Sequence, residues 1–186
     1  MIIRQILLRR PRELFHMYKL VLRLDVGSRA EDFTLNDVNG KAVRLGDLLG
    51  RGIVFLTFYR GGFDRESIRY LKALAENYPR MRDLGVEVIA ITPELRGKAK
   101  AMAESLDLPF TVLCDPELVV TKQYDVYSPM MEWCWPAGFV IGEDGIIQYT
   151  FRGVSPPNTP PVSYLMKKFE QMRAPKEEAA GKAAAR

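Results

Sequence analysis

The stretch "FLTFYRGGFDRESIRYLKAL" (residues 55–74) places a short apolar strand before a glycine turn and an amphipathic helix. Residues 53–59, "IVFLTFY", form a nearly continuous apolar run, as is typical of a central strand that is buried on both faces. After the turn, the apolar residues share one face of a helix predicted over about 64–77: Ile68, Leu71, Leu74 and Ala75. This order predicts the first strand-to-helix step of a mainly parallel sheet.

The flanking sequence continues the alternation of strands and helices. "DVNGK" (37–41) carries the Asn-Gly signal of a two-residue hairpin turn, and "EDG" (143–145) predicts the turn of a second hairpin. Further strands are expected at 86–92, 110–114, 137–142 and 145–151, and further helices at 94–108, 115–126 and about 162–173. We therefore expect one α/β domain with a mixed central sheet, helices on both faces and an N-terminal hairpin.

Three regions are predicted along the chain: a basic amphipathic N-terminal arm with helical spacing (1–25), the domain (26–173) and a low-complexity, disordered tail (174–186). Residues 1–24 hold six basic residues and one acidic residue, a formal charge of +5 against +4 for all 186 residues. The rest of the chain is therefore close to neutral, so nucleic-acid binding is not expected. The arm is expected either to pack on its own domain or on a second subunit, or to contact a membrane surface or larger complex.

The composition excludes several classes of protein. Two cysteines and one histidine are too few for a disulfide scaffold or an ordinary structural zinc site, and no nucleotide-binding motif is present. No metal or cofactor is expected. Unpaired thiols in a chain without a signal peptide favour a cytoplasmic location. The basic arm suggests an alternative, in which the protein lies at a membrane surface.

Several blocks in register resemble the peroxiredoxin-like proteins of the alkyl hydroperoxide reductase/thiol-specific antioxidant (AhpC/TSA) family: "DFTLNDVNGKAVRLGDLL", "FLTFYRGGF", "GVEVIAITPE", "LPFTVLCDPELVVTKQYDV" and "PAGFVIGEDGIIQYTFRG". The resemblance covers roughly residues 26–155 and implies a three-layer thioredoxin-like fold. Relatives of this kind tend to read F-Y-R-G-x-W-C-P-Y-C at the first catalytic turn. On that pattern Asp64 and Ser67 stand where the two cysteines are expected.

A serine cannot replace the thiol in this chemistry. Peroxide reduction needs a thiolate that attacks the O–O bond and then becomes a sulfenic acid, and disulfide exchange needs two sulfur atoms. Asp64 is instead a preferred N-cap residue, and Glu66 in the first turn favours the helix dipole. We interpret Asp64 and Ser67 as vestigial redox positions that have become a structural helix start.

The two cysteines in the chain are the remaining redox candidates. Cys134 lies in "EWCWPAG", where the resemblance implies that Pro136 faces the first catalytic turn, and Cys114 ends a predicted strand at the same edge of the sheet. Each is either a small buried hydrophobe or a relocated redox thiol. An exposed subset of the nearby aromatic residues would form a protein-binding edge, for which the candidates are Tyr59, Arg60, Phe63, Trp135 and Pro136, with Trp133 and Met130 beside them.

Two functions follow from this pattern. The main hypothesis is a redox-inactive domain that acts as a protein-binding or accessory subunit, so that no catalytic residue is expected. The alternative is a thiol-dependent oxidoreductase or peroxidase that uses Cys134, with Cys114 as its partner. A homodimer is compatible with both.

Overall fold

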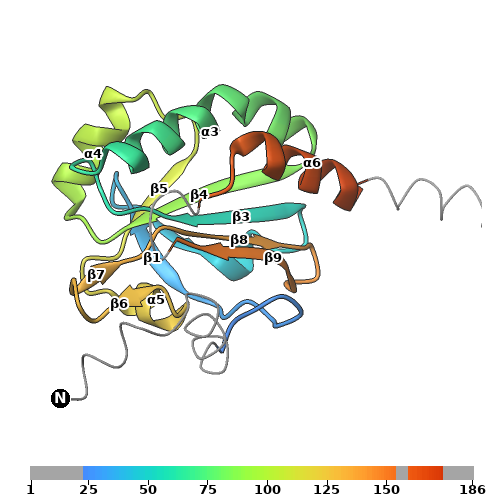
Figure 1. The fold of residues 1–186 in the computed structure, drawn as a ribbon, viewed down its shortest axis with the longest axis horizontal. Helices are drawn as coiled ribbons and strands as arrows, with labels where there is room; N and C mark the ends of the chain where they lie inside the picture. The colour runs from blue at the N-terminus through green and yellow to red at the C-terminus, as the bar shows by residue number, and fades with distance from the viewer. Residues whose placement is uncertain (1–22, 154–158, 174–186) are drawn as a thin grey trace, which may run out of the picture.

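A central sheet of seven strands organises the molecule. The computed structural model describes residues 23–153 and 159–173, in which the strand order is β2-β1-β5-β4-β3-β8-β9 (Figure 1). The three central strands are parallel and the outer pairings are antiparallel. Their bounds are β3 (Ile53–Phe58), β4 (Val86–Thr92) and β5 (Thr111–Cys114), flanked by β8 (Ala137–Ile141) and β9 (Ile147–Arg152). The expected mixed sheet is confirmed.

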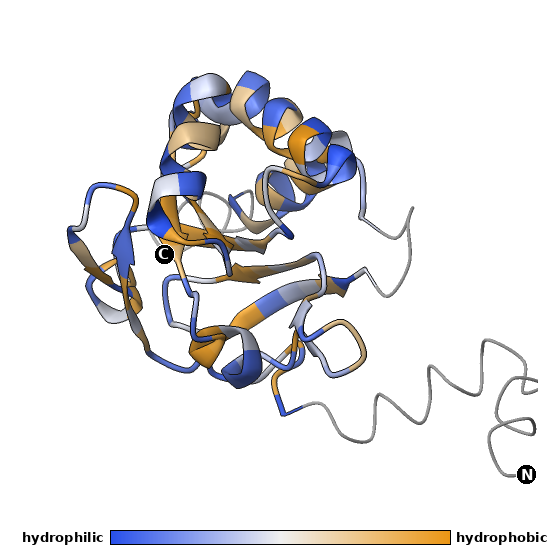
Figure 2. Cartoon of the chain, turned by 90° about the vertical axis from the view of Figure 1, so that its left-hand side faces the viewer, coloured by the Kyte–Doolittle hydropathy of each residue, from blue (hydrophilic) through white to orange (hydrophobic). Residues whose placement is uncertain are grey.

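The apolar run that decides the fold lies at the centre of this sheet. All six residues of β3 are buried, because successive side chains point into two different cores. Phe55 faces the core beneath α3 (Arg65–Asp83), α4 (Arg96–Ser105) and α6 (Val162–Arg173), whereas Leu56 faces the opposite core with α5 (Val119–Gln123). Figure 2 shows mostly apolar colour on the central strands and more polar colour on the helices above them.

The N-terminal hairpin has a different turn from the one predicted. β1 (Thr34–Asp37) and β2 (Ala42–Arg44) pair as expected, with a one-turn 3₁₀ helix, η1 (Leu45–Asp47), after them. The Asp37 N–H donates to the Lys41 carbonyl at 2.8 Å, so residues 38–40 form a three-residue loop rather than the two-residue turn. Gly40 ends this loop with φ +88°, a conformation that favours glycine.

Three helices differ in extent from the prediction, and α4 is the smallest change, since it covers Arg96–Ser105 rather than 94–108. α3 continues to Asp83, past Pro79 and beyond the expected end near residue 77, because Tyr78 and Met81 extend its buried face. The helix expected from residue 115 begins only at Val119, since Leu118 adopts a left-handed conformation with φ +57°. Asp115 accepts hydrogen bonds from the backbone N–H groups of Val119 and Thr121, so this carboxylate orders the turn before the helix.

A small hairpin was not predicted. Residues 127–134, to which no element was assigned from the sequence, include the two-stranded sheet of β6 (Tyr127–Ser128) and β7 (Trp133–Cys134). It lies beside α5, apart from the central sheet (Figure 1). Strands of two residues carry almost no periodic signal, so only contacts made elsewhere in the fold reveal them.

Hydrogen bonds and burial hold the first described residues, Arg23 and Leu24, against the domain. Leu24 is buried, and the backbone N–H groups of Arg23 and Leu24 both donate to the Asp125 carboxylate. The Arg152 guanidinium donates to the Leu24 carbonyl. The predicted tail and residues 1–22 of the predicted arm lie outside the described residues. Within 23–153 and 159–173, no helix is both long enough and apolar enough to cross a membrane.

Candidate functional site

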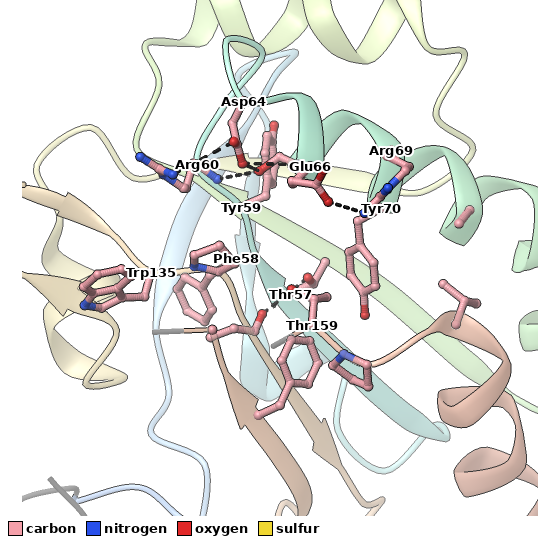
Figure 3. Close-up of a pocket in the computed structure, with 18 of the residues that line it drawn as sticks. Thr57, Phe58, Tyr59, Arg60, Asp64, Glu66, Arg69, Tyr70, Trp135 and Thr159 are labelled. Atoms are coloured by element: carbon pink, nitrogen blue, oxygen red, sulfur yellow. Dashed lines mark hydrogen bonds and ion pairs between the residues drawn. The ribbon is translucent and has the colours of Figure 1, made fainter. Parts of the chain in front are cut away.

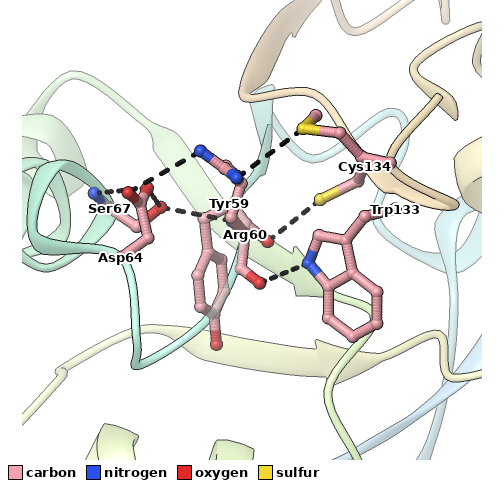
Figure 4. Close-up of polar contacts among 7 residues, drawn as sticks. Tyr59, Arg60, Asp64, Ser67, Trp133 and Cys134 are labelled. Carbon is pink, nitrogen blue, oxygen red and sulfur yellow. Dashed lines mark hydrogen bonds and ion pairs between the residues drawn. The ribbon is translucent and has the colours of Figure 1, made fainter. Parts of the chain in front are cut away.

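The start of α3 is closed by a polar network of three residues (Figure 4). Asp64 has extended backbone angles, and its carboxylate accepts hydrogen bonds from the Ser67 backbone N–H at 3.2 Å and from the Ser67 hydroxyl at 2.6 Å. The Ser67 oxygen accepts in turn from the Arg60 backbone N–H at 3.2 Å. Asp64 is therefore the N-cap of α3, as predicted, and the Ser67 hydroxyl is already used as both donor and acceptor.

The Arg60 side chain links this network to the β6–β7 hairpin. Its guanidinium lies 3.9 Å from the Asp64 carboxylate, and it donates to the Met131 sulfur at 3.7 Å. The same group sits 5.9 Å from the centre of the Phe63 ring, within the range of a cation–π contact. The Arg60 carbonyl accepts a hydrogen bond of 2.6 Å from the Trp133 indole N–H. The hairpin thus covers the turn that precedes α3.

Cys134 is sealed beneath this hairpin. Its side chain is 0% exposed, and the thiol donates to the Tyr59 carbonyl at 3.3 Å. Burial raises the pKa of the Cys134 thiol to about 12, and the nearby Arg60 charge offsets only part of that effect. A thiol with so high a pKa is mostly protonated near neutral pH, and the thiolate is the nucleophilic form.

Cys114 has a similar character in a different element. It ends β5 and is buried, and desolvation raises the pKa of its thiol although the Arg96 charge acts in the opposite direction. Both thiols are free. The structure therefore places Cys114 in β5 and Cys134 in β7 without a disulfide between them.

The predicted protein-binding edge is only partly exposed. Phe63 is 63% exposed, and its ring meets the half-buried Trp133 ring edge-to-face at 6.2 Å. Met130, in the same hairpin as Trp133, is 86% exposed. Tyr59 is only 2% exposed, because its ring packs in the core under α3, so its inclusion in the edge was wrong. We call Phe63, Met130 and Trp133 the aromatic edge.

A buried carboxylate, which the sequence did not reveal, supports the same turn. Glu94 follows β4, is 7% exposed and accepts a hydrogen bond from the Gly62 backbone N–H at 3.0 Å. Gly61 has φ +131°, and a Cβ atom there would lie 2.6 Å from the Glu94 carboxyl carbon. Gly61 is thus required both by its backbone angle and by the space that Glu94 fills. The "GG" pair at 61–62 was the only local signal of this contact.

A pocket of about 420 Å³ lies beside the N-cap network, between α3 and β9 (Figure 3). It brings Trp135 and Pro136 next to Asp64 and Ser67. Sequence reasoning missed the opposite wall, which combines Tyr70 of α3 with residues near the end of β9 and before α6: Phe151, Gly153, Thr159, Pro160 and Pro161. In the part of the chain that the structure describes, no group of three or more His, Cys, Asp or Glu side chains could hold a metal ion.

Solved structures of peroxiredoxin type share this fold. The chain superposes on a peroxidoxin, BcpB, from Mycobacterium tuberculosis with a TM-score of 0.73 at 20% identity, over 83% of this chain and 99% of that chain. Similarity to the AhpC of Enterococcus faecalis gives a TM-score of 0.71 at 20% identity, over 80% of this chain and 92% of that one. At identities this low, the structural similarity establishes the fold alone. It confirms the predicted thioredoxin-like fold.

Sequence comparison extends the likeness to curated proteins. The chain is 30% identical to the thiol-disulfide oxidoreductase ResA of Bacillus thuringiensis subsp. konkukian over 132 residues, 70% of this chain and 72% of that protein. It is also 30% identical to a chloroplastic peroxiredoxin Q of Triticum aestivum over 131 residues, 70% of this chain and 60% of that protein. The profile of the AhpC/TSA family matches residues 26–150. The chain therefore belongs to the AhpC/TSA family.

Proposed function

We propose that this protein is a redox-inert member of its family that acts by binding a protein partner at the aromatic edge. One observation carries the first half of this proposal. The thiols of Cys114 and Cys134 are buried, and burial raises the pKa of both. At the start of α3, where a thiol would gain from the helix dipole, Ser67 is tied into the cap by Asp64.

The second half of the proposal rests on exposure. Phe63 and Met130 present large apolar side chains to solvent beside Trp133, and Arg60 stacks near the Phe63 ring. Aromatic, methionine and arginine side chains are the types enriched in the centres of protein interfaces. A partner that presents an apolar groove would bury Phe63 and Met130 together.

A paired-variant capture experiment tests the binding role. Phe63→Ser combined with Met130→Ser removes the two exposed apolar side chains of the aromatic edge, and Val26→Ser combined with Leu95→Ser removes two other exposed apolar side chains. We expect proteins captured by the wild type to be lost from the edge variant and kept by the control variant. Equal capture by both variants would exclude the aromatic edge as the binding surface.

A second candidate is a thiol-dependent oxidoreductase or peroxidase that works through Cys134. The names of the relatives concern thiol redox chemistry, and this fits the thiol function better than a redox-inactive accessory role. In such a reaction the Cys134 thiolate attacks the O–O bond of a hydroperoxide, which yields a sulfenic acid and releases an alcohol or water. A thiol from Cys114 or another molecule would then form a disulfide with loss of water.

The thiol function requires the β6–β7 hairpin to open, because it covers the Cys134 sulfur. Peroxide titration followed by sulfenic-acid trapping and mass spectrometry distinguishes the two candidates. Oxidation of both thiols no faster than that of free cysteine supports the redox-inert proposal. Much faster oxidation at Cys134, abolished by Cys134→Ser, would replace it with the thiol function.

A further inference from the structure

The pocket beside the N-cap network has walls suited to an apolar ligand. Its sides are formed by rings from three separate parts of the chain: Tyr70 of α3, Phe151 of β9 and Trp135 before β8. Pro136, Pro160 and Pro161 also line it. Figure 3 shows the Tyr70 ring pointing down from α3, opposite Trp135 on the far side of the site. Because proline rings are rigid, little ordering is needed when a ligand enters.

Several polar groups that line the pocket have partners within the protein, whereas the Tyr70 hydroxyl and the Arg60 Nε have no hydrogen-bond partner among the described residues. Asp64 accepts from Ser67, and the Thr57 hydroxyl donates to the Ala137 carbonyl at 3.4 Å. The Gly153 backbone N–H donates to the Pro136 carbonyl at 2.6 Å. A ligand that needs several hydrogen bonds would have to displace the contacts of Asp64, Thr57 and Gly153, so most of its binding energy must come from the burial of apolar surface.

The charges around the pocket also cancel. Two basic residues, Arg60 and Arg69, line it together with two acidic ones, Asp64 and Glu66. Each arginine lies within ion-pair distance of one carboxylate, Arg60 with Asp64 and Arg69 with Glu66. An ionised ligand would lose its hydration and find no unpaired opposite charge, which costs binding free energy.

From these features we propose that the pocket binds an uncharged, mainly apolar ring compound, of the size of one or two fused rings. Its volume of about 420 Å³ lies in the lower part of the range for small-molecule sites. This site is independent of both the protein-binding role and the thiol role, since neither Phe63 nor Cys134 lines it. A ligand here would lie against the α3 cap without any covalent step.

Titrations with 2-acetonaphthone, a neutral fused-ring ketone, test the proposal, with 2-naphthoate as the anion of the same shape. Binding is followed by amide chemical shifts in two-dimensional NMR. We expect the ketone to bind with a Kd on the order of 0.1–1 mM and to shift the resonances of Thr57 and Gly153. The anion should bind at least about tenfold more weakly, because both arginines that line the pocket are already paired with carboxylates.

Two blocking variants and one control locate the site. Ala73 on α3 lines the pocket, so Ala73→Leu should weaken ketone binding about tenfold or more, and Thr159→Phe should do the same from the opposite rim. Ala101→Leu, on the exposed face of α4, should change nothing. Unchanged ketone binding in both folded blocking variants would overturn the proposal. So would equal affinity for the anion, or shifts confined to residues outside the pocket.

Discussion

Removal of the hydrogen bond between the Trp133 indole and the Arg60 carbonyl should make the Cys134 thiol more reactive. The Trp133 N–H donates to the Arg60 carbonyl at 2.6 Å and helps to hold the β6–β7 hairpin over the sulfur. Trp133→Phe deletes this donor and keeps an aromatic ring. A hydrogen bond of this kind contributes about 1 kcal/mol, so hairpin opening should become roughly fivefold more frequent.

The labelling rate of Cys134 in the wild type follows from the pKa of its thiol. The pKa of Cys134 is raised to about 12 from an ordinary 9.0, so at pH 8 the thiolate fraction is about 1,000-fold lower than that of an unperturbed cysteine. Labelling through the closed state should therefore be negligible, and the observed rate should follow the open state. Cys114 does not lie in the hairpin and should keep its rate.

Iodoacetamide labelling at pH 8, quantified for each cysteine by peptide mass spectrometry, measures these rates. Trp135→Phe is the matched control, because it removes a neighbouring indole and leaves the Trp133 hydrogen bond in place. Two results would refute the reasoning. One is a wild-type Cys134 that reacts as fast as free cysteine, and the other is a Trp133→Phe variant that labels no faster than the Trp135→Phe control.

Three further predictions concern the α3 cap and the protein surface. Asp64→Ala should lower the free energy of unfolding by about 1–2 kcal/mol in urea denaturation, since it removes the cap and the acceptor of a buried hydroxyl, whereas Glu66→Ala should cost less than about 0.5 kcal/mol. Ser67→Cys should create a thiol that alkylates faster than Cys134 at the same pH, because position 67 lies in the first turn of α3, where the helix dipole lowers the pKa of a thiol; an equal or slower rate would contradict this explanation. Desolvation raises the pKa of Asp32, but the hydrogen bond from the Gly46 N–H and the interactions with Arg44 outweigh it and hold the pKa below 3.8. The stability from this carboxylate is present above pH 3.8 and lost as the pH falls through the lowered value, so Asp32→Asn should show a shallower loss of stability in acid.

Much of the fold was predictable because its signals are local. The apolar run at 53–59 required a strand with two buried faces, and residues 86–92 repeated the pattern, so both became central strands. The Asp64 cap was predictable for the same reason, since donor and acceptor are only three residues apart. The ends of the helices were harder to predict. Leu118 adopts a left-handed conformation that shortens α5, and its residue type does not indicate that conformation.

The candidate site was predictable only in part, because its decisive contacts join residues far apart in the chain. The local pattern around Cys134, two tryptophans and a proline, was equally compatible with an accessible thiol and a buried one. The hydrogen bond between Trp133 and Arg60 spans 73 positions, and the contact of Cys134 with Tyr59 spans 75. The exposure of the thiol therefore depends on segments that are far apart in the sequence.

The sequence by itself determined the order of the strands of the central sheet and of the helices, the capped start of α3 and the presence of only two thiols, since each of these depends on residue type and short-range spacing. Tertiary structure alone decided that both thiols are buried, that Tyr59 belongs to the core and that a pocket opens beside Ser67. The physical reason is that solvent exposure, and with it the pKa of a thiol, depends on the atoms packed around a group. Those atoms come from chain segments that only the folded sheet brings together.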